Sequence, residues 1–138
     1  MRFLGVDFGF KRIGLATGEE TSGLTTPLQT LKASGSLQKD AEQIKKIAKS
    51  QQVDRIIVGI PYDTDQRIGS QAKICLQLVE KLKTLSVSVS TVDETLSSIE
   101  AENISKELGL KLSAHRRIRD TQSARIILER FFHESQTQ

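Results

Sequence analysis

Apolar and polar residues alternate in short blocks at the start of the chain, which predicts strands rather than helices. Apolar runs cover residues 3–8 and 13–16, and a glycine-containing segment separates them. Short apolar runs bounded by glycine are typical of strands, and Gly9 allows the backbone to turn sharply. A third run, Pro27–Leu31, precedes a predicted turn at residues 33–36. We therefore expect three consecutive antiparallel strands in the first quarter of the chain.

From Leu37 onward the apolar positions recur at helical spacing. A second helix is expected from about Ser70. A third is expected over residues 98–109, because Ser97 and Glu100 match a capping box that satisfies free amides at a helix start. The apolar stripes of the first two helices consist of Leu37, Ala41, Ile44, Ile47 and Ala48, then Ala72, Cys75 or Leu76, Val79 and Leu82.

Two β-rich runs alternate with these helices. Arg55–Ile60 is continuously apolar after its first residue, which is typical of a strand buried on both faces, and Val87–Val92 is the next such run. Strand–helix–strand units form parallel sheets with right-handed crossovers. The expected fold is therefore α/β, with a mixed five-stranded sheet, antiparallel over its first three strands, and helices on both faces. No linker divides the chain, so residues 1–138 are expected to form one domain.

The end of the chain combines a basic stretch with a final helix. Residues 110–119 are dense in cations and are expected to form a loop, with the helix beginning at Asp120. Counting back four residues from Ala124 reaches Asp120, so this carboxylate either points inward or caps the helix. The apolar face of this helix consists of Ala124, Ile127, Leu128 and Phe131.

Composition limits the classes of function. The net charge is only +3, and no apolar run approaches membrane-spanning length. The single cysteine, Cys75, lies in a helical apolar stripe and is expected in the core, which suits a reducing compartment. We expect a cytoplasmic protein with no membrane partner. With no Trp and one Tyr, a surface of several aromatic platforms for unpaired bases is not expected.

Three carboxylates follow or open elements that should meet at one edge of the sheet. Asp7 ends the first strand, Glu94 follows the fifth and Asp120 opens the last helix. Converging carboxylates repel unless a cation neutralises them, and oxygen ligands favour Mg²⁺ or Mn²⁺. Two such ions would suit phosphodiester hydrolysis. Strand alternation lets only one of Asp93 and Glu94 reach this site, and we favour Glu94 as the ligand. Asp7 as an ordinary turn residue remains the alternative.

Several cations are candidates for holding nucleic-acid phosphates, although a solvated basic face is the alternative interpretation. They are Lys11, Arg12, Arg67, Arg116, Arg117 and Arg119.

The chain resembles the YqgF (RuvX) family over essentially its whole length. The resemblance rests on Gly5-Val6-Asp7-Phe8-Gly9 with Lys11-Arg12-Ile13-Gly14, on Ile57-Val58-Gly59-Ile60-Pro61, on Asp93-Glu94 with Ser97-Ser98, and on Asp120 with Ala124 and Ile126-Ile127-Leu128. It implies a ribonuclease H-like fold related to the RuvC resolvases. It also implies a metal-dependent nuclease acting in maturation of the 5′ end of 16S ribosomal RNA, with Asp7, Glu94 and Asp120 as metal-binding acids. The chain departs from the usual pattern at Thr95, Arg67, Arg119 and Ser123.

Other functions remain open from the sequence. Resolution of branched DNA would use the same acids, and a non-catalytic module could bind structured RNA through the basic tail. An Asp-x-Gly tip also occurs in actin-like ATPases, but those proteins need two such domains. A monomer and a homodimer are both compatible with the sequence.

Overall fold

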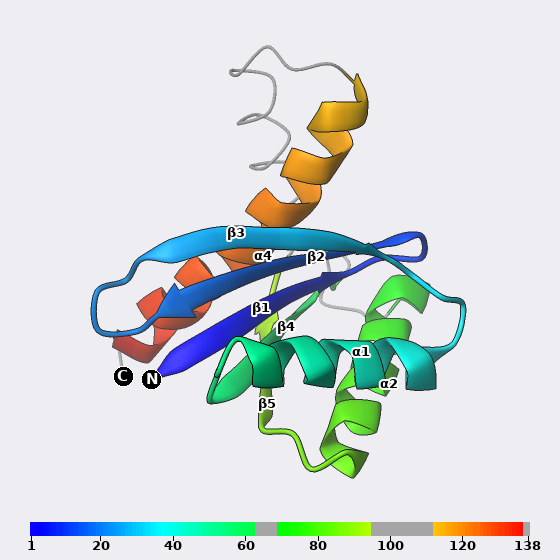
Figure 1. Cartoon of the computed structure of the whole chain (residues 1–138), viewed down its shortest axis with the longest axis horizontal. Helices are drawn as coiled ribbons and strands as arrows, with labels where there is room; N and C mark the ends of the chain where they lie inside the picture. Colours follow the sequence, from blue (N-terminus) through cyan, green and yellow to red (C-terminus); the bar gives the residue numbers. More distant parts are fainter. Residues whose placement is uncertain (63–68, 95–111, 137–138) are drawn as a thin grey trace.

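The computed structural model describes residues 1–62, 69–94 and 112–136, and in the last helix the described side chains run from Thr121 to Glu134. The helix expected over residues 98–109 and the loop that carries Arg67 lie outside the described residues. In chain order the elements are β1 (Arg2–Phe8), β2 (Arg12–Glu19), β3 (Thr25–Lys32), α1 (Leu37–Ser50), β4 (Arg55–Ile60), α2 (Ser70–Thr84), β5 (Val89–Asp93) and α4 (Leu112–Gln136) (Figure 1).

The strands form one five-stranded sheet in the order β3-β2-β1-β4-β5. Strands β1, β2 and β3 pair antiparallel as a meander, whereas β4 pairs parallel with both β1 and β5. The mixed sheet expected from the sequence is therefore confirmed. Because β1, β4 and β5 run the same way, their carboxyl ends share one edge of the sheet, as the alternation of strands and helices requires.

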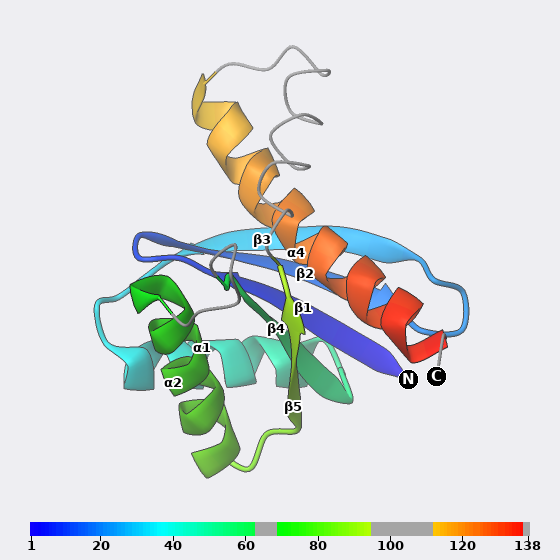
Figure 2. The same ribbon diagram turned by 180° about the vertical axis from the view of Figure 1, so that it is seen from behind.

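Helices cover both faces of the sheet (Figures 1 and 2). Alternation along β1 sends Leu4, Val6 and Phe8 into the cluster under α1 and α2, and Phe3 into the cluster under α4. Strand β4 alternates in the same way, which explains why its sequence is continuously apolar. Cys75 is fully buried in the α1–α2 cluster, as expected.

Helix α4 lies unusually close to the sheet because a glycine faces it. A Cβ on Gly5 would lie 2.7 Å from the carbonyl oxygen of Ala124 and 2.7 Å from Cγ of Leu128. Such distances are far inside van der Waals contact, so only glycine permits this approach. The contact fixes where α4 crosses β1.

The turn between β3 and α1 caps the start of α1 and also forms a hydrogen bond to the β1–β2 hairpin. The Ser36 hydroxyl caps α1 by accepting a hydrogen bond from the Lys39 amide at 3.3 Å. The Ala33 amide donates to the carbonyl of Lys11 at 2.9 Å, and the Gly9 amide donates to that of Arg12 at 2.9 Å. The tip of the hairpin is therefore held at two points.

Two expectations about the last helix were wrong. Helix α4 begins at Leu112, not at Asp120, so the basic stretch is helical and Asp120 does not cap the helix. Residues 112–136 contain no glycine or proline, and Ala, Leu and Arg are good helix formers, so cation density did not indicate a loop.

Phe132 is the more deeply buried aromatic of α4, 4% exposed, while half-buried Phe131 packs against the edge of the same cluster. None of the described helices is long and apolar enough to cross a membrane.

Candidate active site

Asp7 lies at the carboxyl end of β1 on the face that α4 covers. It alternates with Phe8, which faces the other way, and it is half-buried. Its neighbour in β2 is Gly14, and in β4 the residue after Val58, the partner of Val6, is Gly59. Neither neighbouring position carries a side chain, and at Gly59 the space is taken by Ile127 of α4 and by Glu94, whose Cδ1 and Cδ lie 2.5 Å and 3.0 Å from where a Cβ would be.

Glu94 follows β5 and enters the same space. Its amide donates to the carbonyl of Ile60 at 3.2 Å, so the β4–β5 ladder extends past the end of the strand. Val92 lies in the cluster under α4, so alternation sends Asp93 to the opposite face and returns Glu94 to the face of Asp7. The Glu94 side chain is 5% exposed, and its Cδ lies 3.0 Å from where a Cβ on Gly59 would be. The geometry favours Glu94 over Asp93 as the acid of the site.

The Cys75 thiol is close to both carboxylates. Its Sγ approaches the carbonyl oxygen of Phe8 at 3.7 Å, immediately after Asp7. Burial and, to a lesser degree, the negative charges of Glu94 and Asp7 together raise the pKa of Cys75 to about 12, while a hydrogen bond from Gln71 opposes the shift. Both carboxylates therefore act on one buried atom, which indicates that they share a region.

The position of Asp120 follows from the path of α4. The Ala124 carbonyl lies over Gly5, while Phe132 packs on Phe3 with ring centroids 5.4 Å apart. Helix α4 therefore runs antiparallel to β1, and Asp120, one turn before Ala124, belongs at the level of Asp7 along the strand. The side chain of Asp120 lies outside the described residues. Among the side chains that the structure does describe, no three His, Cys, Asp or Glu residues are close enough to hold a metal ion.

The residues present fit a hard divalent cation. Asp7 and Glu94 carry carboxylate oxygens, the ligands that such an ion prefers, and Glu94 can lie close to β4 because Gly59 has no side chain. Ser123 is 1% exposed, and its Oγ has no hydrogen-bond partner among the described residues. A buried hydroxyl without a partner costs about 1–3 kcal/mol, so a water of a hydrated ion would supply a partner that the described residues do not.

Arginines on α4 fasten the helix to the strands that carry the site. Arg130 Nη1 donates to the carbonyl oxygen of Asp93 at 3.0 Å, directly before Glu94. Arg125 Nε donates to the hydroxyl of Thr25 at 3.0 Å and also pairs with Glu129 at 3.2 Å. The two arginines therefore fasten α4 to opposite ends of the sheet, at β5 and at β3.

The predicted phosphate-binding cations occupy two places. Arg12 is half-buried at the start of β2 and, since Ile13 faces α1 and α2, shares the face of Asp7, while Lys11 is exposed in the hairpin turn. Arg67 lies outside the described residues. Arg116, Arg117 and Arg119 fall in the N-terminal turns of α4, which project beyond the sheet (gold in Figure 1). Positions 116 and 117 precede 120 by four and three residues, so they share its helical face.

Sequence reasoning missed three residues that shape the site: Gly59, Ser123 and Arg130. A lone glycine inside a β-branched run is a recognised signal of close approach, so Gly59 had a usable signal. Ser123, a polar residue beside the apolar stripe of α4, gave a weaker one. Nothing in the pattern distinguishes Arg130 from an exposed helix cation.

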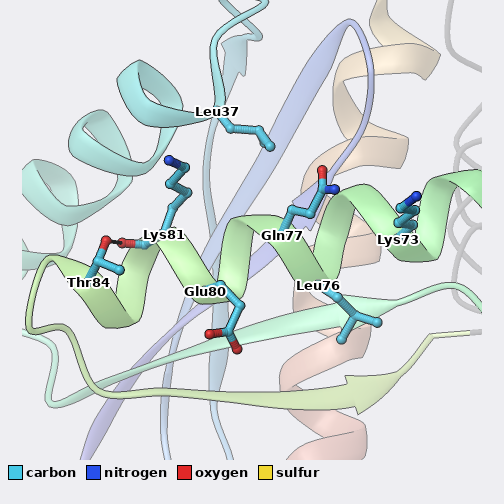
Figure 3. Close-up of a pocket in the computed structure, with 7 residues that line it drawn as sticks. All are labelled: Leu37, Lys73, Leu76, Gln77, Glu80, Lys81 and Thr84. Carbon is cyan, nitrogen blue, oxygen red and sulfur yellow. Dashed lines mark hydrogen bonds between the residues drawn. The ribbon is translucent and has the colours of Figure 1, made fainter.

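A separate hollow lies between α1 and α2. It has a volume of about 670 Å³ and is lined by Leu37 of α1 and by Lys73, Leu76, Gln77, Glu80, Lys81 and Thr84 of α2 (Figure 3). It contains neither Asp7 nor Glu94, so it is not the candidate active site.

Comparisons with known proteins identify relatives of the whole chain. Residues 1–134 match the family model RuvX, described as a Holliday junction resolvase. A protein of Endomicrobium trichonymphae is 34% identical over 132 residues, covering 94% of each chain, and carries the name "Putative pre-16S rRNA nuclease". A Synechococcus protein of the same name is 37% identical over 136 residues, covering 95% of this chain and 88% of its own.

Solved structures show the same fold. Thermus thermophilus RuvC, in complex with a Holliday junction substrate, superposes with a TM-score of 0.59 at 16% identity, covering 99% of this chain and 96% of its own. A fowlpox virus resolvase bound to Holliday junction DNA gives 0.58 at 13% identity, covering 98% and 99%. The sheet order and helix placement are thus those of the RuvC, ribonuclease H-like fold. With the family model matching nearly the full length, the chain belongs to the RuvX family.

Proposed function

We propose that this protein is a divalent-metal-dependent endonuclease that hydrolyses phosphodiester bonds, acting in the cytoplasm in maturation of the 5′ end of pre-16S rRNA. The observation that carries the proposal is the pairing of Asp7 and Glu94 on one face of the sheet, where the lack of a side chain at Gly59 lets Glu94 lie close to β4. The names of the RuvX relatives support the substrate.

Asp7, Glu94 and Asp120 are the proposed ligands of Mg²⁺ or Mn²⁺, and the carboxylate set suits two ions. When bound, the metal activates a water and stabilises the leaving oxygen of the phosphodiester. The sheet edge holds Asp7 and Glu94 in a fixed relation, and the close packing of α4 over Gly5 supports Asp120 as the third acid. Asp93 then serves as a neighbour whose carbonyl is held by Arg130.

Substrate positioning is assigned to the cations of the hairpin and of α4, namely Lys11, Arg12, Arg116, Arg117 and Arg119, with Arg67 as a further contact. The first turn of α4 contains no acidic residue, and three arginines follow it. Positive charge at a helix N-terminus opposes the helix macrodipole and disfavours the isolated helix. Phosphates held there would remove this conflict, which supports a phosphate-binding role for these turns.

Resolution of branched DNA is the second candidate, because the family model carries that description. It uses the same carboxylates, so the two candidates differ in substrate and not in chemistry. Purified protein with matched RNA and four-way DNA substrates under Mn²⁺ separates them by the products formed. The protein is proposed to act as a monomer or a homodimer.

Conservative substitutions test the acid assignment. Asp7→Asn and Glu94→Gln each keep size and hydrogen bonding but remove a ligand charge, so cleavage should be lost while nucleic-acid binding persists. Asp93→Asn is the matched control and should retain most activity, because Asp93 faces away from the site. Turnover by Asp7→Asn at the wild-type rate, or loss in Asp93→Asn alone, would contradict the assignment.

A melting experiment tests the metal separately from catalysis. Mn²⁺ or Mg²⁺ should raise the Tm of the wild-type protein with concentration, because an ion that binds only the folded state stabilises it by mass action. The rise should shrink in Asp7→Asn, Glu94→Gln and Asp120→Asn. A Tm that does not respond to millimolar metal would refute a site.

A further inference from the structure

Phe10 is the most exposed aromatic residue of the chain, and it lies at the catalytic edge. The structure describes all six aromatic residues: Phe3, Phe8 and Phe132 are buried, Tyr62 and Phe131 are half-buried, and Phe10 is 64% exposed. It occupies the turn between β1 and β2, three residues after Asp7, so their α-carbons lie at most about 11 Å apart. An exposed phenyl ring at this position is not needed for the core.

The ring of Phe10 forms one wall of a hollow with a volume of about 300 Å³. Phe8, Leu37 and Ile74 supply apolar walls, whereas Asp40 and Gln77 add polar groups. One Asp40 oxygen accepts a hydrogen bond from the Ser34 amide at 3.0 Å. Leu37 and Gln77 also line the larger hollow, and their side chains extend into the space between α1 and α2 (Figure 3). The hollow therefore has both apolar walls and polar groups that can form hydrogen bonds.

The hairpin tip separates this hollow from the carboxylates. Asp7 points to the α4 face, while Phe8 and the hollow lie on the α1–α2 face of the same edge. The tip is fixed by the hydrogen bonds from Gly9 to Arg12 and from Ala33 to Lys11, so Phe10 is held in a defined place. Lys11 and Arg12 follow it directly, where they can hold the backbone of a strand that bends around the tip.

We propose that Phe10 and this hollow bind one unpaired nucleobase of the substrate, next to the phosphodiester held at Asp7 and Glu94. The base stacks on the phenyl ring, and its edge meets Asp40 and Gln77, which can accept from and donate to the donors and acceptors of a base. Asp40 keeps the Ser34 amide as one partner, and the edge of a base offers the further donors and acceptors that a purely apolar partner would lack. The proposal rests on the nucleic-acid substrate of the proposed function and adds a preference for a bulge, loop or branch beside the cleaved bond.

Binding without metal tests this independently of cleavage. Two RNA duplexes are compared in EDTA, one fully paired and one with a single unpaired 2-aminopurine. Wild-type protein should bind the duplex with the unpaired base more tightly than the paired one. The fluorescence of the 2-aminopurine should change on binding. Phe10→Ala should weaken binding of the RNA with the unpaired base by about 5- to 100-fold and leave the paired RNA unaffected. Phe10→Leu, apolar but not planar, should behave like Phe10→Ala, while Phe10→Tyr should rescue the preference.

Leu24→Ala is the matched control. Leu24 is 70% exposed in the β2–β3 turn, away from the carboxylates, so its loss should leave the preference unchanged. Equal effects of Leu24→Ala and Phe10→Ala, or a wild-type protein with no preference for the unpaired base, would overturn the base site. A DNA version of the pair should show the same preference, since stacking does not read the 2′-hydroxyl. Because no divalent ion is present, a failure of nuclease activity leaves this comparison unaffected.

Discussion

Gly59→Ala is expected to damage stability and the candidate site together. The new Cβ would lie 2.5 Å from Cδ1 and 2.8 Å from Cγ1 of Ile127, and 3.0 Å from Cδ of Glu94. Carbon atoms in contact prefer about 3.5–4.0 Å, so Ile127 must retreat by about 1 Å. Ile127 is fully buried against β4 and has no free volume to enter. Overpacking of this kind costs about 1–3 kcal/mol. For a chain of this length that corresponds to a Tm lower by about 3–10 °C.

Calorimetry with and without Mn²⁺ separates the two effects of Gly59→Ala. The displaced Glu94 carboxylate should bind metal less well, so the variant should lose stability in the apo state and also lose most of the metal-dependent rise in Tm. Gly18→Ala is the control on the same face, because its Cβ would meet Phe132 and Leu128 at 3.1–3.2 Å, away from the carboxylates. It should change the apo Tm little and keep the metal response. A Gly59→Ala protein with wild-type Tm and metal response would refute the idea that this glycine makes room for Ile127 and Glu94.

Three further outcomes are expected. Ser123→Ala removes a buried hydroxyl without a described partner. The free energy of unfolding of the apo protein, measured by denaturant titration, should rise by up to about 1–3 kcal/mol, while the Mn²⁺-induced rise in Tm shrinks. Unchanged apo stability would contradict this. Arg116→Ala with Arg117→Ala should flatten the slope of log affinity against log salt by about two units, whereas Arg119→Ala, off that helical face, should flatten it less; equal slopes would count against the assignment. The pKa of Cys75 is raised from 9.0 to about 12 in the folded protein, so the thiol of the unfolded chain ionises first as pH rises. The free energy of unfolding should therefore fall above pH 9, by up to about 1.4 kcal/mol per pH unit. Cys75→Ala should remove that part of the pH dependence.

The sheet and the placement of Glu94 on the face of Asp7 were accessible from the sequence because strands have a rigid two-residue period. Once β5 is recognised, alternation alone sends adjacent side chains to opposite faces, and the apolar Val92 decides which face is inward. The same two-residue period explains why β4 is apolar at consecutive positions, because its side chains enter the hydrophobic clusters on both faces of the sheet. That the chain is one domain, and that Asp7, Glu94 and Asp120 bind metal, stay predictions.

The start of α4 was not accessible, because the sequence contains no stop signal there. Gly109 is the last glycine before Gln136, and the basic residues after it were interpreted as a loop on charge alone. Helix propensity favours Ala114 and the arginines, and only the unfavourable interaction with the macrodipole opposes them. That interaction is worth less than 1 kcal/mol per charge in water, too little to end a helix that packs along the whole sheet.

The longer helix changes what Asp120 can do. As a helix cap its carboxylate would have been occupied by free backbone amides, and it would have been a poor metal ligand. In the third turn of α4 those amides already bond within the helix, so Asp120 has no capping role. The same extension carries Arg116 and Arg117 on the face of Asp120, in turns that pass beyond the sheet. One helix therefore carries position 120 at the level of Asp7 and positions 116 and 117 in turns that pass beyond the sheet (Figure 1). A helix beginning at Asp120 would provide only the first of these.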